Sequence, residues 1–200
     1  MKALAIKRMD ELDDAGLEQA AGVFVDSYFD SLSYLSRDRD ALVGLIRKSF
    51  IRAQFFAAVS EGRVVGITAY STNRTRAIRF EKRDMMQIAG AVKGRLLHAL
   101  FARELHAPLR LADGECYIEA VATDPNARGK GVATALLNQL LERLPYRVFT
   151  LEVTDTNERA IRLYEKQGFA VFRTKKQRLF RKRTGFNARL YMRKTVDKAL

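Results

Sequence analysis

Residues 115–144 place a strand pattern, a glycine-containing turn and an amphipathic helix in direct succession, and this arrangement restricts the fold most strongly. The strand is predicted over 115–123, and the turn that follows begins at Asp124 and Pro125. The helix predicted over 131–144 repeats its leucines at spacings of three and four residues, which aligns them on one face. Because another strand is predicted over 147–154, the segment should form a right-handed crossover between two parallel strands.

The remaining patterns predict a mixed sheet with helices on both of its faces. Helices are expected over 10–31, with Asp10 as the N-cap, and again after Asp40, which should cap the second helix. A hairpin should turn at residues 60–62, a helix should span 157–167, and strands should cover 169–175 and 188–194. We therefore expect an α/β fold that forms one domain over the 200 residues of the chain.

The connection from residue 73 to residue 114 is long for a compact domain, and we expect it to carry a helical insertion at about 81–112. From 84 to 105, apolar side chains recur at helical spacing and should form a buried stripe. The stripe consists of Met85, Ile88, Val92, Leu96, Leu97, Leu100 and Phe101. This helix could cover a substrate site or form a homodimer contact. The start of the connection is rich in arginine, which makes it a poor lining for a cationic substrate.

The composition excludes several classes of protein. Hydrophobic residues make up 48% of the chain, which is enough for a core and too many for a wholly disordered protein. No apolar run approaches the roughly 20 residues that cross a bilayer, and the N-terminus does not resemble a secretory signal. Cys116 is the single cysteine, so no disulfide can form within the chain, and a reducing cytoplasm is the simplest location. Two histidines argue against a His-rich metal centre, and no metal is expected.

The net charge of +13 is concentrated at the C-terminus. Residues 173–200 hold 11 basic side chains and one acid, and the densest run extends from Arg173 to Arg183. Such a run can bind nucleic acid or another anionic surface by neutralising phosphates. We favour the simpler interpretation, which is the solvated face of a basic hairpin over 173–200.

The turn before the helix at 131–144 has the chemistry of an anion site. The free N–H groups at a helix start attract anions, and Gly129 and Gly131 let that backbone approach a phosphate closely. Arg128 and Lys130 add positive charge. The turn is not a Walker A loop and lacks the third glycine of a dinucleotide fingerprint, because Thr134 stands there. A glycine-rich turn that binds nothing remains the alternative.

Two motifs in the correct order resemble the GNAT N-acetyltransferase superfamily. The first is Arg-x-x-Gly-x-Ala at 128–133, after a strand that ends near Pro125. The second consists of Asn157, Ala160, Tyr164, Gly168 and Phe169. The resemblance extends over about 3–172, includes Gly66 in the earlier hairpin, and is strongest within the core motifs at 115–172. It implies a twisted mixed sheet whose fourth and fifth strands splay apart to admit the cofactor.

The resemblance also implies a site for acetyl-CoA as acyl donor. The backbone at the end of the fourth strand should pair with the pantetheine amides, the glycine turn should hold the pyrophosphate, and Asn157 should hydrogen-bond the pantetheine arm. The implied cofactor-binding residues are Val121, Ala122, Thr123, Arg128, Gly129, Lys130, Gly131, Val132, Ala133, Asn157 and Tyr164.

The resemblance further implies that Tyr164 protonates the departing thiolate, a role that suits a phenol at neutral pH. The alternative is a helix aromatic that only packs on the sheet. Glu119 and Glu152 are candidate bases for the attacking amine, directly or through a water. Either carboxylate could instead be a paired structural group, and an amine that arrives neutral needs no protein base.

We therefore expect an acetyl-CoA-dependent N-acetyltransferase that acts on a primary amine by direct attack in a ternary complex. The acceptor could be a small molecule, a peptide or a protein. Two alternatives are a non-catalytic module that binds acetyl-CoA and an RNA- or ribosome-associated acetyltransferase that uses the basic C-terminal residues. A nucleic-acid partner is the less favoured possibility, and no membrane partner is expected.

Overall fold

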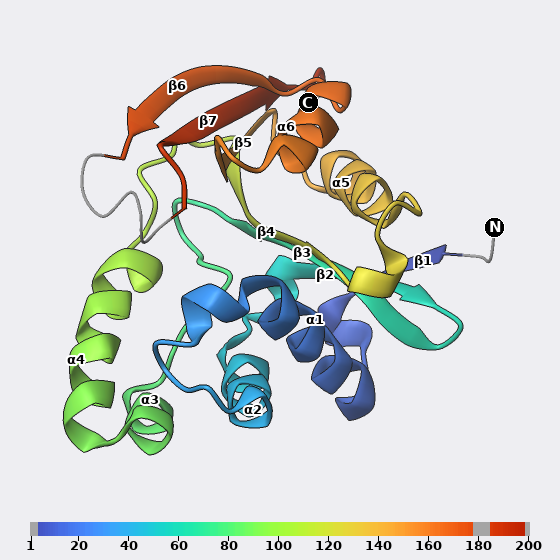
Figure 1. The fold of residues 1–200 in the computed structure, drawn as a ribbon. Helices are drawn as coiled ribbons and strands as arrows, with labels where there is room; N and C mark the ends of the chain where they lie inside the picture. Colours follow the sequence, from blue (N-terminus) through green and yellow to red (C-terminus); the bar gives the residue numbers. More distant parts are fainter. Residues whose placement is uncertain (1–3, 178–184, 199–200) are drawn as a thin grey trace.

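The computed structural model describes residues 4–177 and 185–198, and it contains one mixed seven-stranded sheet (Figure 1). The strand order is β1-β2-β3-β4-β5-β7-β6. β4 and β5 are parallel, whereas the other neighbouring strands are antiparallel. The strands are β1 (Leu4–Arg8), β2 (Phe55–Ser60), β3 (Arg63–Ser71), β4 (Glu115–Thr123), β5 (Val148–Thr154), β6 (Ala170–Lys176) and β7 (Ala188–Thr195). The predicted α/β class and the parallel crossover are confirmed.

Helices cover both faces of the sheet, as the sequence predicts. Figure 1 shows α1 and α2 on one side and α5 and α6 on the other. Each side has its own buried apolar cluster. The helices are α1 (Asp14–Leu32), α2 (Arg39–Ser49), α3 (Lys82–Ala89), α4 (Ala91–Phe101), α5 (Val132–Arg143) and α6 (Glu158–Lys166). Among the helices described, we find none with the length and apolar character that a membrane crossing requires.

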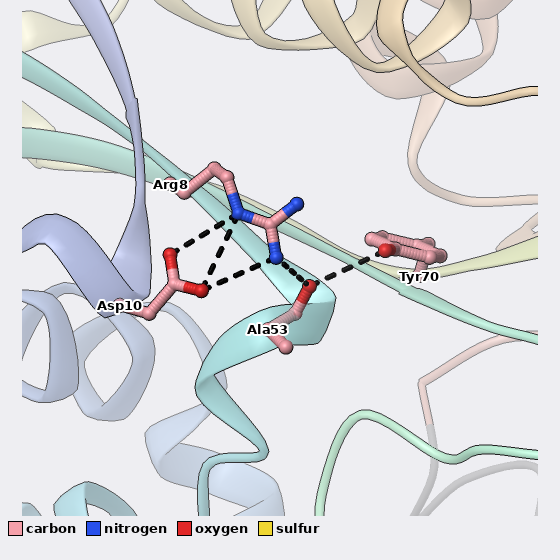
Figure 2. Close-up of polar contacts among 4 residues, drawn as sticks. All are labelled: Arg8, Asp10, Ala53 and Tyr70. Atoms are coloured by element: carbon pink, nitrogen blue, oxygen red, sulfur yellow. Dashed lines mark hydrogen bonds and ion pairs between the residues drawn. The ribbon is translucent and has the colours of Figure 1, made fainter.

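The predicted N-caps of the first two helices are wrong. Asp10 lies in a 3₁₀ turn, where its carboxylate binds the Arg8 guanidinium, and the same guanidinium donates to the Ala53 carbonyl (Figure 2). The cap of α1 is Asp13, whose side chain accepts from the Gly16 amide at 2.8 Å. A cap requires a carboxylate that reaches an amide two or three residues on, and closely spaced aspartates leave the sequence pattern ambiguous.

The second helix begins two residues earlier than predicted, whereas the cap of the first lies three residues later. Asp38 caps α2 and accepts from the amides of Asp40 and Ala41, so Asp40 lies in the first turn. Strand β1 was not predicted, because its five residues form a short edge strand with little sequence signal.

The insertion contains two helices where the sequence predicts one. Gly90 adopts a φ of +84°, which ends α3 and begins α4. The turn changes which face of the second helix meets the protein. Val92, Leu96 and Leu100 are therefore 86%, 61% and 54% exposed, and the prediction that they are buried is wrong. Met85 of α3 is fully buried, as predicted.

The C-terminal residues form the predicted pair of antiparallel strands, β6 and β7. All seven residues of β6 are exposed. This agrees with the prediction that the basic hairpin over 173–200 begins with a solvated strand. Residues 178–184 of the basic run from Arg173 to Arg183 lie outside the described part of the chain.

Candidate active site

Strands β4 and β5 separate into a fork. They pair only from Glu115 to Ile118 on β4 and from Val148 to Leu151 on β5. Beyond that point β4 continues along β3 as far as Thr123, while β5 continues along β7 as far as Thr154. Past this point the facing backbone edges of β4 and β5 are not paired with one another. This separation is what the family resemblance implied.

A β-bulge marks the point where β4 leaves β5. Ala69 of β3 is opposite Ala120, and the next residue, Tyr70, is opposite Ile118, so Glu119 is the extra residue of β4. A bulge bends its strand and increases the local twist, and it redirects the side chains on either side. Accordingly, Ile118 packs in the cluster beside α5 and α6, whereas Ala120 packs in the cluster beside α1 and α2.

The bulged Glu119 is held by a buried ion pair. Its carboxylate accepts from the Arg76 guanidinium, and both side chains are only 11% exposed. The Ala77 amide donates to the second carboxylate oxygen at 3.3 Å, and Arg76 also donates to the Ala107 carbonyl at 3.0 Å. These contacts hold the Glu119 carboxylate in a defined position at the fork.

Glu152 occupies the equivalent place on β5, one residue past the last pair with β4. It binds Arg189 of β7 in a more open ion pair, with 21% of the Glu152 side chain and 43% of the Arg189 side chain exposed. Tyr191 lies opposite Glu152 in the sheet, and its pKa is raised by burial and by its hydrogen bond to the Glu152 carboxylate.

Tyr117 is half-buried between Cys116 and Ile118 of β4. Burial raises the pKa of its phenol, and the charges of Glu152 and then Glu119 raise it further. Both predicted bases therefore act electrostatically on the same tyrosine. The sequence did not indicate Tyr117, Tyr191, Arg76 or Arg189, because the ion pairs join residues 43 and 37 positions apart.

The glycine turn lies at the other end of the unpaired part of β4. Gly129 and Gly131 have φ values of +78° and +81°, a region that favours glycine, and α5 begins directly after them. Residues 128–131 are exposed, so their backbone is accessible to a ligand. Arg128 donates to the Thr123 carbonyl at 3.5 Å, which ties the turn to the strand end.

Arg159 is a further cation at this turn that the sequence did not indicate. A Cβ atom placed on Gly129 would lie 3.7 Å from its Nη2 atom. Arg159 belongs to the first turn of α6, so its guanidinium reaches the glycine turn from a different helix. The predicted cations Arg128 and Lys130 thus gain a third charge from a different helix.

Gly66 of β3 fixes the height of α5 above the sheet. A Cβ atom at this position would lie 2.5 Å from Cγ1 of Val132, the first residue of α5. Any larger residue would therefore lift the start of the helix away from β3 and β4. This close packing explains why glycine stands at the hairpin position noted in the sequence.

Asn157 caps α6, with its side-chain oxygen accepting from the Ala160 amide at 3.2 Å. Because the cap uses the oxygen, the side-chain nitrogen is not consumed by it. Tyr164 is buried in the same helix and packs edge-on against Phe169, with ring centroids 6.0 Å apart. Burial raises the pKa of Tyr164, so its phenol is protonated well above neutral pH.

Tyr28 of α1 links the two faces of the sheet through the fork. Tyr28 has non-helical backbone angles inside α1. Burial raises the pKa of its phenol, and the nearby Val121 backbone opposes that rise. Tyr28 also interacts electrostatically with Tyr164, which comes from the opposite side of the sheet.

The cysteine and the histidines do not form a catalytic or metal-binding group among the residues that the structure describes. Cys116 is fully buried, and burial raises the pKa of its thiol, so the thiolate form of a nucleophile is disfavoured. His106 accepts from the Phe80 amide at 2.9 Å. Across residues 4–177 and 185–198, no cluster of three or more His, Cys, Asp or Glu side chains is suited to a metal.

A forked mixed sheet with a glycine-opened helix beside the fork defines an acyltransferase-type fold, and the comparisons with known proteins agree. The family model described as "Acetyltransferase (GNAT) family" matches residues 23–169. The chain therefore belongs to the GNAT acetyltransferase family, which supports an acetyl-transferring enzyme that uses acetyl-CoA.

Solved structures of this fold align along nearly the whole chain. A protein from Corynebacterium glutamicum described as histone acetyltransferase HPA2 and related acetyltransferase has a TM-score of 0.65 and 21% identity, and the match covers 100% of this chain and 99% of that one. An N-acetyltransferase from Staphylococcus aureus has a TM-score of 0.61 and 20% identity, with 94% and 99% covered. At these identities the likeness concerns the fold.

A curated relative matches over a shorter stretch. The mycothiol acetyltransferase of Acidimicrobium ferrooxidans is 40% identical over 82 residues, which is 39% of this chain and 26% of that protein. The matched part of this chain spans about a quarter of the relative's length, so the likeness does not extend to the whole relative.

Proposed function

We propose that the protein transfers the acetyl group of acetyl-CoA to a primary amine by direct attack in a ternary complex. The observation that carries the proposal is the fork between β4 and β5, with an exposed glycine turn after the end of β4. The buried Tyr164 of α6 supplies the tyrosine that the family resemblance implies. Family membership makes acetyl-CoA the donor. The acceptor is a small molecule, a peptide or a protein.

The residues at the fork fit the cofactor's chemistry. The positive-φ glycines leave backbone N–H groups open at the start of α5, and Arg128, Lys130 and Arg159 supply charge for a diphosphate. The unpaired edge at Val121–Thr123 would pair with the pantetheine amides, and the Asn157 amide nitrogen would bind the same arm. When bound, acetyl-CoA supplies a thioester carbonyl as the electrophile.

Tyr164 would act as the general acid at the thiol that leaves. Its phenol is protonated across the physiological range because burial raises its pKa. A protonated donor in a partly closed site can transfer its proton as negative charge develops on sulfur. The packing against Phe169 orients the ring, so the structural and the catalytic interpretations are compatible.

Of the two carboxylates at the fork, we assign the base to Glu152, acting through a water. Its ion pair with Arg189 is partly open to solvent, so it can be exchanged for a hydrogen bond to water at modest cost. Glu119 is committed to Arg76 and to the Ala77 amide in a more buried setting, which suits a positioning role. Breaking such a buried pair costs about 3–5 kcal/mol.

The test measures release of the CoA thiol with a thiol reagent while amines, peptides and protein N-termini are supplied in turn. We expect turnover that depends on one class of acceptor, and Glu152→Gln should reduce kcat most at low pH, where the amine is protonated. Glu119→Gln serves as the comparison and should lower the free energy of unfolding instead. Binding of acetyl-CoA without turnover on any acceptor would favour a non-catalytic binding module.

Two further features bear on assembly and location. The exposed stripe of α4, formed by Val92, Leu96 and Leu100, is an apolar surface that would suit a homodimer contact. Analytical ultracentrifugation of Leu96→Glu against the unmodified protein tests that contact. Because Cys116 is the single cysteine, the fold needs no disulfide within the chain, which suits a reducing compartment such as the cytoplasm.

A further inference from the structure

A cavity of about 240 Å³ opens beside the fork, at the connection between β3 and α3. Its polar lining consists of Arg74, Arg76, Arg79, His106 and Thr75. The remaining lining includes Ile51, Ile78 and Pro108, which are apolar. Figure 1 shows this connection running from the end of β3 down to α3.

Arg76 connects the cavity to the proposed chemistry. The same guanidinium that lines the cavity holds Glu119, which is the bulged residue at the fork. A molecule in the cavity therefore lies one side chain away from the Glu119 carboxylate. The glycine turn at 128–131 is at the far end of the unpaired part of β4, so this cavity is separate from the proposed diphosphate site.

The cavity keeps a net positive charge. Glu119 offsets the charge of Arg76, but the pair between Arg79 and Glu81 is long, at 3.8 Å, and both side chains are about 70% exposed. Such an exposed pair is screened by solvent and leaves Arg79 available to a ligand. Arg74 is exposed and adds a third guanidinium.

His106 contributes a donor without adding charge. Its Nε2 atom accepts from the Phe80 amide at 2.9 Å, so the proton of the neutral ring is on Nδ1. Burial and then the nearby His98 and Arg79 lower the pKa of His106, which agrees with the neutral form. The polar groups of the cavity are thus guanidinium and imidazole donors, which recognise carboxylate and phosphate oxygens.

From these observations we infer that the cavity is an acceptor subsite, and that the acceptor is a small amine carrying a carboxylate or phosphate on a short aliphatic stem. This inference rests on the proposed amine acetylation. The volume is below the roughly 300 Å³ at which pockets for drug-sized ligands begin, so it suits one anionic group and its stem. The isoleucines and Pro108 would contact the stem, and the arginines would bind the oxyanion.

The test uses matched acceptors with purified full-length protein. Each amino acid is compared with its carboxamide, and an amino alcohol with its phosphomonoester, by kcat/KM for release of the CoA thiol. We expect the anionic member of a pair to be preferred by about 10-fold or more at low salt, with the preference declining as salt rises. The favoured pair tells a carboxylate acceptor from a phosphate acceptor.

The variant Arg74→Gln/Arg79→Gln should raise KM for the anionic acceptor about 10-fold, and leave kcat, the neutral acceptor and the Kd of CoA unchanged. Arg83→Gln removes an exposed charge of α3 that does not line the cavity, and it should change none of these values. Equal kcat/KM for charged and neutral acceptors, or a preference that survives in the double variant, would overturn the inference.

A binding measurement separates this inference from the proposed function. Calorimetry on the CoA-loaded protein should detect an N-acetyl amino acid or a phosphomonoester, and the double variant should weaken that binding about 10-fold. If neither anion binds, the subsite is refuted even where neutral amines are acetylated. If an anion binds but no amine is acetylated, the proposed function fails and the anion site stands.

Discussion

The two ends of the fork present different chemical groups, backbone at one end and side chains at the other. The end near α5 uses backbone: two positive-φ glycines, a helix start and an unpaired strand edge. The end where β4 and β5 stop pairing uses long side chains that bind one another, such as Arg76 with Glu119 and Arg189 with Glu152. A cofactor shared by a whole family can be bound by backbone groups, whereas an acceptor particular to one protein requires side chains.

This difference predicts how the two ends respond to substitution. A backbone site depends on a few conformations that tolerate no side chain, so single changes there should have large effects. A side-chain site distributes binding over several charges, so single changes should be moderate and dependent on salt.

The largest expected effect is at the glycine turn. Gly131→Glu requires a φ of +81° at a residue with a Cβ, which costs about 1–2 kcal/mol, and it places a negative charge where a diphosphate should bind. We expect the Kd of CoA to rise by about 100-fold or more, because charge-assisted hydrogen bonds each contribute about 1.5–3 kcal/mol. Isothermal titration calorimetry measures the change.

Gly62→Glu is the matched control. Gly62 has a φ of +73° in the β2–β3 hairpin and has nothing within 4 Å of its absent Cβ, as is also true of Gly131. It should lower the free energy of unfolding by a similar amount while leaving CoA affinity intact. An unchanged affinity in Gly131→Glu would remove the diphosphate assignment.

The next effect tests the acid at the fork. Tyr164→Phe keeps the ring packed on Phe169 and removes the hydroxyl, so kcat should fall about 100-fold with little change in the affinity for acetyl-CoA. Because burial raises the pKa of Tyr164, the phenol should not titrate near pH 8, and any alkaline limb of kcat near that pH should persist in the variant. Stopped-flow measurement over a range of pH checks both statements.

Tyr146→Phe is the control for this substitution, since Tyr146 lies after α5 and contacts Tyr70 instead. If kcat were the same in Tyr164→Phe and in the unmodified protein, the hydroxyl would have no role in proton transfer and Tyr164 would be a packing residue.

The contrast between the two ends also explains which features the sequence could predict. Gly129 and Gly131 directly precede the helix they would serve, so the local pattern indicated them, while Asn157 and Tyr164 were indicated by a short motif of the family resemblance. The partners of Glu119 and Glu152 are 43 and 37 residues away, and no local pattern identifies them. The bulge at Glu119 and the break at Gly90 each redirect side chains, and neither follows from hydrophobic periodicity.

A third prediction concerns Arg159, a side chain of α6 that lies beside the glycine turn. Arg159→Gln removes the guanidinium beside Gly129, and we expect the Kd of CoA to rise about 10-fold at low salt and less at high salt. Arg162→Gln on the same helix is the control, because Arg162 is exposed and pairs with Glu158 at 3.0 Å. Equal effects of the two substitutions would mean that α6 contributes only a general field.

The smallest expected effect is at Tyr28, which lies near the unpaired part of β4. The Val121 backbone lowers the pKa of the Tyr28 phenol against the effect of burial. The cofactor's pantetheine arm would need the same backbone, so cofactor binding should exchange one partner for another. Tyr28→Phe keeps the ring beside Phe24, at a centroid distance of 4.8 Å, and removes the competing hydroxyl. Because one hydrogen bond contributes about 0.5–1.5 kcal/mol, acetyl-CoA should bind about 3-fold more tightly, while the cofactor-free protein loses about 1 kcal/mol of its free energy of unfolding. Calorimetry and urea unfolding measure the two quantities, with Tyr34→Phe on the exposed stretch after α1 as the control. Weaker binding of acetyl-CoA in Tyr28→Phe would show that the hydroxyl stabilises the bound state, and Tyr28 would then belong to the cofactor site itself.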